Sequence, residues 1–385
     1  MTCIVQANAV YDRAARTPAD LLDSYRTLTE SSDAAAKAGA RVSVVQRFHA
    51  GATVEHNGIP YRFVTDAHPP WLSAGEAPKA FVEAIVAQSP DVVHLNGLIF
   101  PALAGAIRAA AGPKTAIVIQ HHGGEFPIRG QGVIGWWKQR QWRRGLAAAD
   151  ALSFTAREQA EPWRAAGVIG DQRIIEIVEA STTMRTVERD RARAAIGVTG
   201  SPVILWVGRL TTNKDPLTVL DGLERVLPRL PAAQAVMVFG DDTLLPAVDE
   251  RVRGSSILQS QVILTGRVTH QEMPNFYGAA DVLISGSHSE GSGYALIEAM
   301  AAGVVPVVTD IPSFRAIAGE CGRRWAAGDA QQCASALWSV LDGDLQGESE
   351  KCRARFDRDL SWDAIGQRTV SEYQTIRLKA DAPRR

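Results

Sequence analysis

Short apolar runs alternate with longer amphipathic stretches along this chain, and the alternation forms two successive series. Helical stretches such as 21–38 and 77–87 separate the strands of the first series. Strands that alternate with helices in this way predict a parallel sheet covered by helices on both faces. The fold class is therefore α/β, with two doubly wound, Rossmann-like units. The predicted strands lie near residues 3–8, 42–47, 91–95 and 116–120 in the first series, and near 203–207, 235–239, 261–264, 281–285 and 305–308 in the second.

The length of the chain also favours two domains. At 385 residues it is too long for one ordinary hydrophobic core. We assign residues 1–185 to the first domain and residues 200–361 to the second. The intervening segment, 186–200, is charged and ends in Gly-Val-Thr-Gly, which predicts a linker. The residues from 362 onward predict a C-terminal helix.

Charge and cysteine content exclude several classes of protein. Lys and Arg number 41 against 42 Asp and Glu, so nothing in the net charge of −1 indicates a nucleic-acid partner. The cysteines, Cys3, Cys321, Cys333 and Cys352, lack metal-binding spacing and do not form a disulfide framework. No apolar run approaches the length of a membrane span, and the N-terminus lacks the pattern of a signal peptide. We therefore expect a cytoplasmic protein.

Two cations share one predicted strand-to-helix loop. Arg209 and Lys214 follow the strand at 203–207, and Asp215 with Pro216 has the pattern of a helix N-cap and first residue. Open α/β sheets bind ligands at the carboxyl ends of their strands. The planar fork of Arg and the point charge of Lys both suit a diphosphate. The alternative is a pair of solvated loop cations.

Two carboxylates lie eight positions apart around the next helix start. Glu290 lies in a strand-to-helix loop, and Glu298 lies on the apolar helix that begins at Tyr294. Ser292 is the predicted N-cap, and the exposed amides of the helix end would favour a phosphate. A carboxylate in apolar surroundings needs partners, and adjacent sugar hydroxyls supply them. Alternatively, Glu298 caps a backbone group or pairs with an Arg, and Glu290 is a solvated loop residue.

Taken together, these motifs resemble those of the retaining glycosyltransferases of family 4, which have the GT-B fold. The resemblance rests on Gly-Arg-Leu at 208–210, Lys-Asp at 214–215, Gly-Arg-Val at 266–268 and the E-x7-E pair at 290 and 298, and it is densest over residues 200–325. It implies two Rossmann-like domains that face each other across a cleft. The first would bind the acceptor and carry the C-terminal helix, residues 362–385, packed back on it, and the second would bind the nucleotide-sugar donor.

The resemblance implies roles for individual residues. Arg209 and Lys214 would hold the donor diphosphate and stabilise it as it leaves, Glu290 would contact the donor sugar, and Glu298 would bond the ribose. Neither a metal ion nor another cofactor is expected, because the two cations take the place of a metal. The Gly-Asp-Asp at 240–242 is accordingly interpreted as a turn of the nucleotide pocket. The backbone of Gly291, Ser292, Gly293 and Tyr294 would hold the sugar and phosphate, and Gly266, Arg267 and Val268 would line the base pocket.

A histidine pair follows the strand at 116–120. His122 matches the family position whose histidine faces the donor sugar, with His121 as the second candidate. The glycines at 123 and 124 would let a ligand approach the backbone. A structural, hydrogen-bonded histidine is the alternative. His94 matches another strand end of the family and is predicted to line the cleft.

Residues 135–144 combine three tryptophans with four cations. Basic, aromatic helices of this kind lie at membrane interfaces or bind an anionic, lipid-linked acceptor. The alternative is an ordinary helix, with Trp136 and Trp137 partly in the core and the cations solvated. If this stretch contacts lipid, the protein works at the inner face of the membrane.

The resemblance predicts a retaining hexosyltransferase of bacterial cell-surface polysaccharide or glycolipid synthesis. It would move a sugar from a UDP- or GDP-sugar to a hydroxyl of a sugar, glycolipid or polysaccharide acceptor. Two alternatives stay open. A GT-B nucleotide-sugar epimerase would need acid-base carboxylates in its cleft, whereas a non-catalytic subunit of an assembly complex would have lost the phosphate-binding cations.

Overall fold

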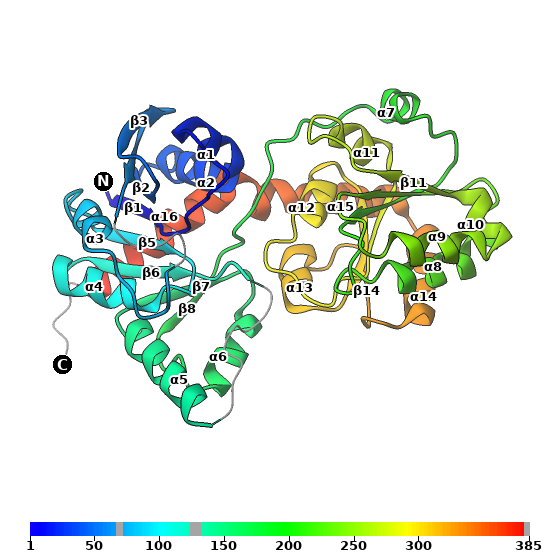
Figure 1. Ribbon diagram of the computed structural model, residues 1–385. Helices are drawn as coiled ribbons and strands as arrows, with labels where there is room; N and C mark the ends of the chain where they lie inside the picture. The colour runs from blue at the N-terminus through cyan, green and yellow to red at the C-terminus, as the bar shows by residue number, and fades with distance from the viewer. Residues whose placement is uncertain (67–71, 124–131, 381–385) are drawn as a thin grey trace. The chain divides into compact units, whose positions relative to one another are not determined.

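A computed structural model describes residues 1–66, 72–123 and 132–380 (Figure 1). The chain forms two compact units, residues 1–179 with 362–385, and residues 180–361. Each unit is built around its own predominantly parallel sheet with helices on both faces, as the sequence pattern predicts. Because Gly124 and residues 381–385 lie outside the described parts, the roles predicted for them stay predictions.

The first unit contains an eight-stranded sheet in the order β3-β4-β2-β1-β5-β6-β7-β8. Every neighbouring pair is parallel except β3 and β4. The order reverses between β1 and β5, which makes that junction the topological switch point. The strands are β1 Cys3–Asn8, β2 Arg41–Arg47, β3 Ala52–His56, β4 Ile59–Val64, β5 Val92–Asn96, β6 Ala116–Gln120, β7 Ala151–Phe154 and β8 Arg173–Glu176.

The two faces of this sheet bury separate apolar clusters. Successive residues of β1 point to opposite faces, so that Ile4 joins one cluster and Val5 the other. Phe81 of α3 and Leu103 of α4 pack on the Val5 face, whereas Leu28 of α2 packs on the Ile4 face. The helices of this unit are α1 Pro18–Ser24, α2 Arg26–Lys37, α3 Lys79–Val86, α4 Pro101–Ala111, α5 Gly132–Leu146, η1 Arg157–Ala160, α6 Glu161–Ala165 and α16 Trp362–Ala380.

The C-terminal helix α16 belongs to the first unit. The indole Nε1 of Trp362 donates to Glu30 Oε2 at 2.9 Å, and Tyr373 is buried in the Ile4 cluster. A side chain at Gly366 would collide with the Ala34 carbonyl of α2, so the glycine permits close contact between these helices. This arrangement corresponds to the packing that the resemblance implies for the C-terminal helix.

The second unit contains a six-stranded, wholly parallel sheet in the order β11-β10-β9-β12-β13-β14. The order reverses between β9 and β12, which is the switch point of this unit. The strands are β9 Val203–Gly208, β10 Gln234–Phe239, β11 Val262–Gly266, β12 Val282–Ser285, β13 Val305–Thr309 and β14 Arg323–Trp325.

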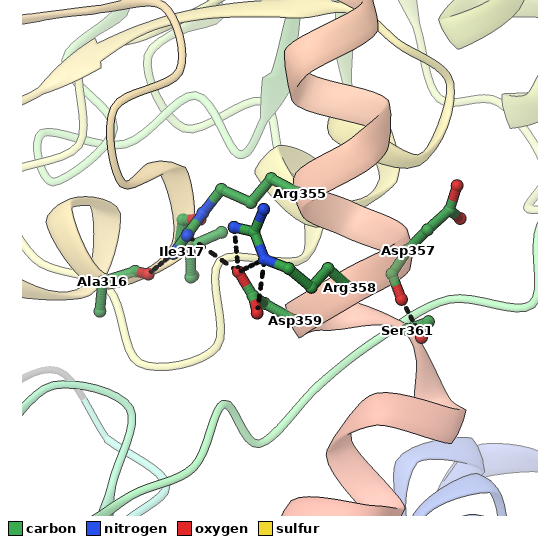
Figure 2. Close-up of polar contacts among 7 residues, drawn as sticks. All are labelled: Ala316, Ile317, Arg355, Asp357, Arg358, Asp359 and Ser361. Atoms are coloured by element: carbon green, nitrogen blue, oxygen red, sulfur yellow. Dashed lines mark hydrogen bonds and ion pairs between the residues drawn. The ribbon is translucent and has the colours of Figure 1, made fainter.

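Helices cover this second sheet, and the chain leaves the unit through a short π-helix, η3. Ser361 follows η3, and its hydroxyl donates to the Asp357 carbonyl at 3.0 Å (Figure 2). The helices are α7 Arg189–Ile196, α8 Pro216–Val226, η2 Leu227–Arg229, α9 Leu245–Arg253, α10 Ser256–Gln261, α11 Met273–Ala279, α12 Tyr294–Ala301, α13 Pro312–Ala318, α14 Ala330–Leu341, α15 Leu345–Arg355 and η3 Phe356–Leu360.

The segment predicted as a linker, 186–200, is instead largely the helix α7, packed on α11. Two of its arginines instead neutralise a buried acid: Arg193 and Arg189 pair with the carboxylate of Asp281 at 2.7 and 3.0 Å. The same carboxylate accepts from the Val203 amide at 2.7 Å. The linker prediction was wrong because the charged residues suggested a solvent-exposed segment. Two of them, Arg189 and Arg193, instead neutralise the buried carboxylate of Asp281.

Candidate functional site

The loops after β9 and β12 flank the switch point of the second unit, where open α/β sheets bind ligands. The two loops pack backbone against backbone: a side chain at Gly286 would approach the Asp215 carbonyl to 2.9 Å. They are also joined by hydrogen bonds from the His288 amide to the Asn213 carbonyl, at 2.8 Å, and from Asn213 Nδ2 to the Ser289 carbonyl, at 3.0 Å. The predicted phosphate and sugar residues therefore meet in one place.

Lys214 and Glu290 contact each other across this junction. Each side chain is 18% exposed, so the pair is mostly shielded but open on one side. Burial, and secondarily the charge of Arg209, lower the pKa of Lys214 to about 8. The Glu290 carboxylate, which also accepts from the Ser287 hydroxyl at 3.2 Å, opposes that shift by favouring the ammonium form. The sequence did not indicate that these two residues pair.

Arg209 is exposed and lies near the ends of two other strands. The Leu210 amide donates to the Asp241 carbonyl at 3.0 Å, and Arg267 donates to the Gly240 carbonyl at 2.5 Å. Hydrogen bonds from Thr243, followed by the charges of Arg209 and Arg267, lower the pKa of Asp241. The Gly-Asp-Asp turn thus joins the two arginine-bearing loops.

Residues 266–268 provide the third loop at this edge of the sheet. Gly266 has φ +79°, a conformation that favours glycine. Arg267 is exposed and Val268 is half-buried. The loop lies at the carboxyl end of β11, beside the turn after β10, which suits the predicted base pocket.

The N-cap of α12 is Gly293, with φ +64°, rather than the predicted Ser292. A side chain at Gly293 would approach the Ile317 Cδ1 methyl to 2.6 Å, so α13 packs tightly beneath this turn. The left-handed backbone favours glycine at this position, which is why the ordinary N-cap preference for serine failed. Gly291, Ser292 and the exposed Tyr294 remain at the amino end of α12, as predicted.

Glu298 is half-buried one helical turn into α12, and its carboxylate lies beside the buried hydroxyl of Tyr277 on α11. Burial, followed by the neighbouring Glu298 charge, raises the pKa of Tyr277 well above its ordinary value, so its phenol stays protonated. The sequence predicted that Glu298 needs a partner but gave no sign that Tyr277 is beside it.

In the first unit, His122 lies at the carboxyl end of β6. Its Nδ1 contacts the Glu179 carboxylate, and its Nε2 lies 3.0 Å from Asn96 Oδ1. The Glu179 side chain is 2% exposed and that of His122 is 37% exposed. A buried carboxylate thus orients an accessible imidazole. Sequence reasoning missed Glu179 and Asn96, because a single acid and a single amide after strands give no spacing signal.

The other two candidate histidines, His121 and His94, are buried. His121 is stacked on Phe154, with ring centroids 5.0 Å apart, and burial lowers its pKa to about 4. His94 is buried against the Tyr373 hydroxyl of α16, and burial lowers its pKa to about 3. The prediction that His94 lines a cleft was wrong, because the C-terminal helix covers it.

The basic, aromatic stretch forms the helix α5. Trp142 is buried, but Trp136 and Trp137 are 52% and 59% exposed and pack edge to face. The Arg140 guanidinium lies 5.5 Å from the Trp136 ring centre. A groove of about 680 Å³ between α4 and α5 is lined by Trp137, by the cations Lys138, Arg140 and Arg144, and by small residues such as Ala102 and Gly105.

Within residues 1–66, 72–123 and 132–380, no three His, Cys, Asp or Glu side chains gather in a way that would hold a metal ion. No helix in those ranges has the length and apolar character that crossing a membrane requires.

Comparisons with known proteins agree with the geometry of both units. Residues 26–177 match the family model described as "Glycosyl transferase 4-like domain", and residues 201–343 match "Glycosyl transferases group 1". Sucrose-phosphate synthase from Thermosynechococcus elongatus has a similar structure, with a TM-score of 0.68 at 19% identity over 99% of this chain and 100% of that one. The chain belongs to the family 4 glycosyltransferases and has the GT-B fold, as the sequence motifs predicted.

Curated relatives include a GDP-mannose:cellobiosyl-diphosphopolyprenol alpha-mannosyltransferase from Xanthomonas campestris. It is 26% identical over 295 residues, which is 74% of each chain. A phosphatidyl-myo-inositol mannosyltransferase from Mycobacterium leprae is 26% identical over 297 residues, also 74% of each chain. A crystal structure of an Anabaena protein in complex with UDP has a TM-score of 0.67 at 15% identity, covering 97% of this chain and 100% of that one.

Proposed function

We propose that this glycosyltransferase moves a hexose from a UDP- or GDP-sugar to an acceptor hydroxyl with retention of anomeric configuration. The observation that carries the proposal is the Lys214–Glu290 pair at the switch point, with Arg209 on the same strand-to-helix loop. A cation and a carboxylate side by side suit a ligand that is itself a diphosphate joined to a polyol.

Binding of the donor would exchange partners within this pair. In the structure the Lys214 ammonium contacts Glu290. A diphosphate carries more charge than one carboxylate, so it would draw the ammonium away and free Glu290 for the hydroxyls of the donor sugar. Glu298, oriented beside Tyr277, would bond the ribose.

The proposed reaction depends on stabilising the negative charge that develops on the leaving diphosphate. When the bond between the anomeric carbon and the phosphate oxygen breaks, the leaving diphosphate gains charge, which Arg209, Lys214 and the amino end of α12 would stabilise. The acceptor hydroxyl attacks on the same face, and the leaving phosphate oxygen takes its proton. Arg209 and Lys214 thereby take the part that a metal ion plays at other diphosphate sites. His122, oriented by Glu179, would contact the donor sugar.

The proposed acceptor is lipid-linked or part of a cell-surface glycan. Two relatives carry a diphosphopolyprenol or a phosphatidylinositol acceptor in their names. We further propose that the enzyme works at the inner, cytoplasmic face of the membrane, and the exposed tryptophans and cations of α5, which suit an anionic membrane surface, support this.

A transfer assay tests this proposal. The protein is incubated with UDP- and GDP-hexoses and with lipid extract as acceptor, with EDTA present, and the anomeric configuration of the product is determined by NMR. We expect transfer from one donor with retention, lost in Arg209→Ala and kept in Arg225→Ala, an exposed arginine of α8. Inversion, a requirement for added metal, or full activity of Arg209→Ala would each contradict the proposal.

A further inference from the structure

Two buried thiols lie near each other in the second unit, where the turn after α13 approaches α15. Cys321 lies in the turn between α13 and β14, and Cys352 lies on α15. Their exposed fractions are 6% and 0%, and neither is part of a disulfide.

Contacts on both sides of Cys352 fix its position against that turn. One turn of α15 earlier, Glu348 Oε2 accepts from the Gly322 amide at 3.2 Å. One turn later, Arg355 Nε donates to the Ile317 carbonyl at 2.7 Å. Residues spaced by four and three positions share one face of a helix. Cys352 therefore faces the turn, where its thiol and that of Cys321 lie close enough for each to shift the pKa of the other.

Arg355 and Arg358 lie close enough to the Cys321 sulfur for their charges to act on it. Figure 2 shows Arg355 reaching the carbonyls of Ala316 and Ile317, at 2.7 Å each, and Arg358 pairing with Asp359 at 2.7 Å. The hydrogen bond from Cys352, followed by the charges of Arg355 and Arg358, lowers the pKa of the Cys321 thiol. The same hydrogen bond, with burial, raises the pKa of Cys352. The thiolate therefore forms on Cys321, while Cys352 keeps its proton.

The other cysteines provide a contrast. Cys333 is fully buried, and burial together with the carboxylates of Asp215 and Asp329 raises its pKa to about 12. The Cys3 thiol faces a backbone carbonyl, that of Gln88, at 3.8 Å. Positive charge beside a thiol favours its reactive thiolate form, and of the four cysteines only Cys321 has both that charge and a second thiol beside it.

We propose that Cys321 and Cys352 are a redox-active dithiol, a modification site that hydrogen peroxide converts to an intramolecular disulfide. The Cys321 thiolate attacks one peroxide oxygen, the O–O bond breaks, and a sulfenic acid and hydroxide form. The Cys352 sulfur then attacks the sulfenic sulfur, the S–O bond breaks, and the disulfide forms. The hydroxide leaving group takes the Cys352 proton, so two thiols are oxidised and one peroxide is reduced to water.

The disulfide would fasten α15 to the turn after α13. It closes a covalent loop from residue 321 to residue 352, which restricts the unfolded chain and stabilises the native state. The oxidised protein should therefore unfold at a higher urea concentration than the reduced protein. Dithiothreitol should restore the original midpoint.

Peptide mapping of the full-length, folded protein tests the proposal. The protein is treated with a small excess of hydrogen peroxide, alkylated under denaturing conditions and digested. We expect the peptides that contain Cys321 and Cys352 to be joined, with Cys333 alkylated. In Cys352→Ser, the sulfenic acid on Cys321 should persist and be trapped by dimedone, whereas Cys333→Ser should behave like the wild type.

Two results would overturn the proposal. One is that both peptides stay separate and fully alkylated after the folded protein has met peroxide. The other is that Cys3 or Cys333 is oxidised as fast as Cys321. Both results come from the wild-type protein, so a variant that fails to fold leaves the test intact.

Discussion

Lys214 and Glu290 are paired with each other at the site where the donor diphosphate is proposed to bind. Their contact joins the loops after β9 and β12 while shielding two charges from water. An ammonium whose pKa is lowered by burial is charged at neutral pH but titrates within an accessible range. The pair therefore connects pH, stability and the proposed donor binding.

The affinity for the nucleoside diphosphate should fall as pH rises through about 8, because Lys214 then loses its charge. The loss should reach about 10- to 100-fold, the worth of a hydrogen bond to a charged group at ~1.5–3 kcal/mol. Lys214→Arg, which stays charged, should remove this dependence.

The stability of the protein without nucleotide should change in the opposite sense. It should rise between pH 8 and the unfolded pKa of 10.5, because the unfolded chain binds more protons than the folded protein in that range. Calorimetry at several pH values measures both.

Glu179 should matter for catalysis through His122. Replacing the buried carboxylate by the neutral amide in Glu179→Gln keeps the shape but weakens the orientation of the imidazole. We expect kcat to fall by roughly tenfold, about the loss of one hydrogen bond at ~1.5 kcal/mol, with nucleotide affinity unchanged. His122→Ala should lose at least as much. Equal activity of Glu179→Gln and the wild type would show that the contact is only structural.

At the scale of elements, α7 is held to its sheet by charge. Removing one partner of a buried ion pair costs ~3–5 kcal/mol, and we expect about 2 kcal/mol for Arg193→Ala because Arg189 still contacts Asp281. The control is Arg191→Ala, an exposed arginine of the same helix, which should change stability little. Urea unfolding of the two variants measures the difference, and equal midpoints would contradict this account of α7.

The helix α5 should bind anionic vesicles. Each cation near an anionic surface contributes roughly 1 kcal/mol, so Lys138→Glu with Arg140→Glu should reduce binding to vesicles that contain phosphatidylglycerol by more than tenfold. Trp137→Ala should weaken binding by loss of apolar contact, and high salt should weaken it in the wild type. Cosedimentation measures all three. Equal binding to neutral vesicles would point away from a charge-based surface.

For the whole molecule, the sequence predicted the order of strands and helices better than it predicted the contacts between side chains. The strand runs at 3–8, 116–120 and 305–308 appear as β1, β6 and β13, because buried parallel strands are continuous apolar runs. The strands β3, β4, β7, β8 and β14 were missed. β7, β8 and β14 have only three or four residues, too few to show a period, whereas exposed residues interrupt β3 and β4, so that neither is a continuous apolar run.

In the candidate site, likewise, the sequence predicted which residues lie on the loops but not which side chains they contact. Motifs placed Arg209, Lys214 and Glu290 on two loops, and the sheet order brings those loops together. Pairing with Glu290, the Gly293 cap and the Glu179 contact of His122 depend on long-range packing, which local sequence does not encode.

The central claim is that the loops at the switch point of the second unit bind the diphosphate of a nucleotide sugar. Isothermal titration calorimetry with UDP and GDP, on the wild type, Arg209→Ala and Arg225→Ala, tests it most directly. We predict that either UDP or GDP binds the wild type and Arg225→Ala with the same affinity. The same nucleotide should bind Arg209→Ala at least tenfold more weakly. Equal affinity in all three proteins, or no binding of either nucleotide to the wild type, would contradict the account.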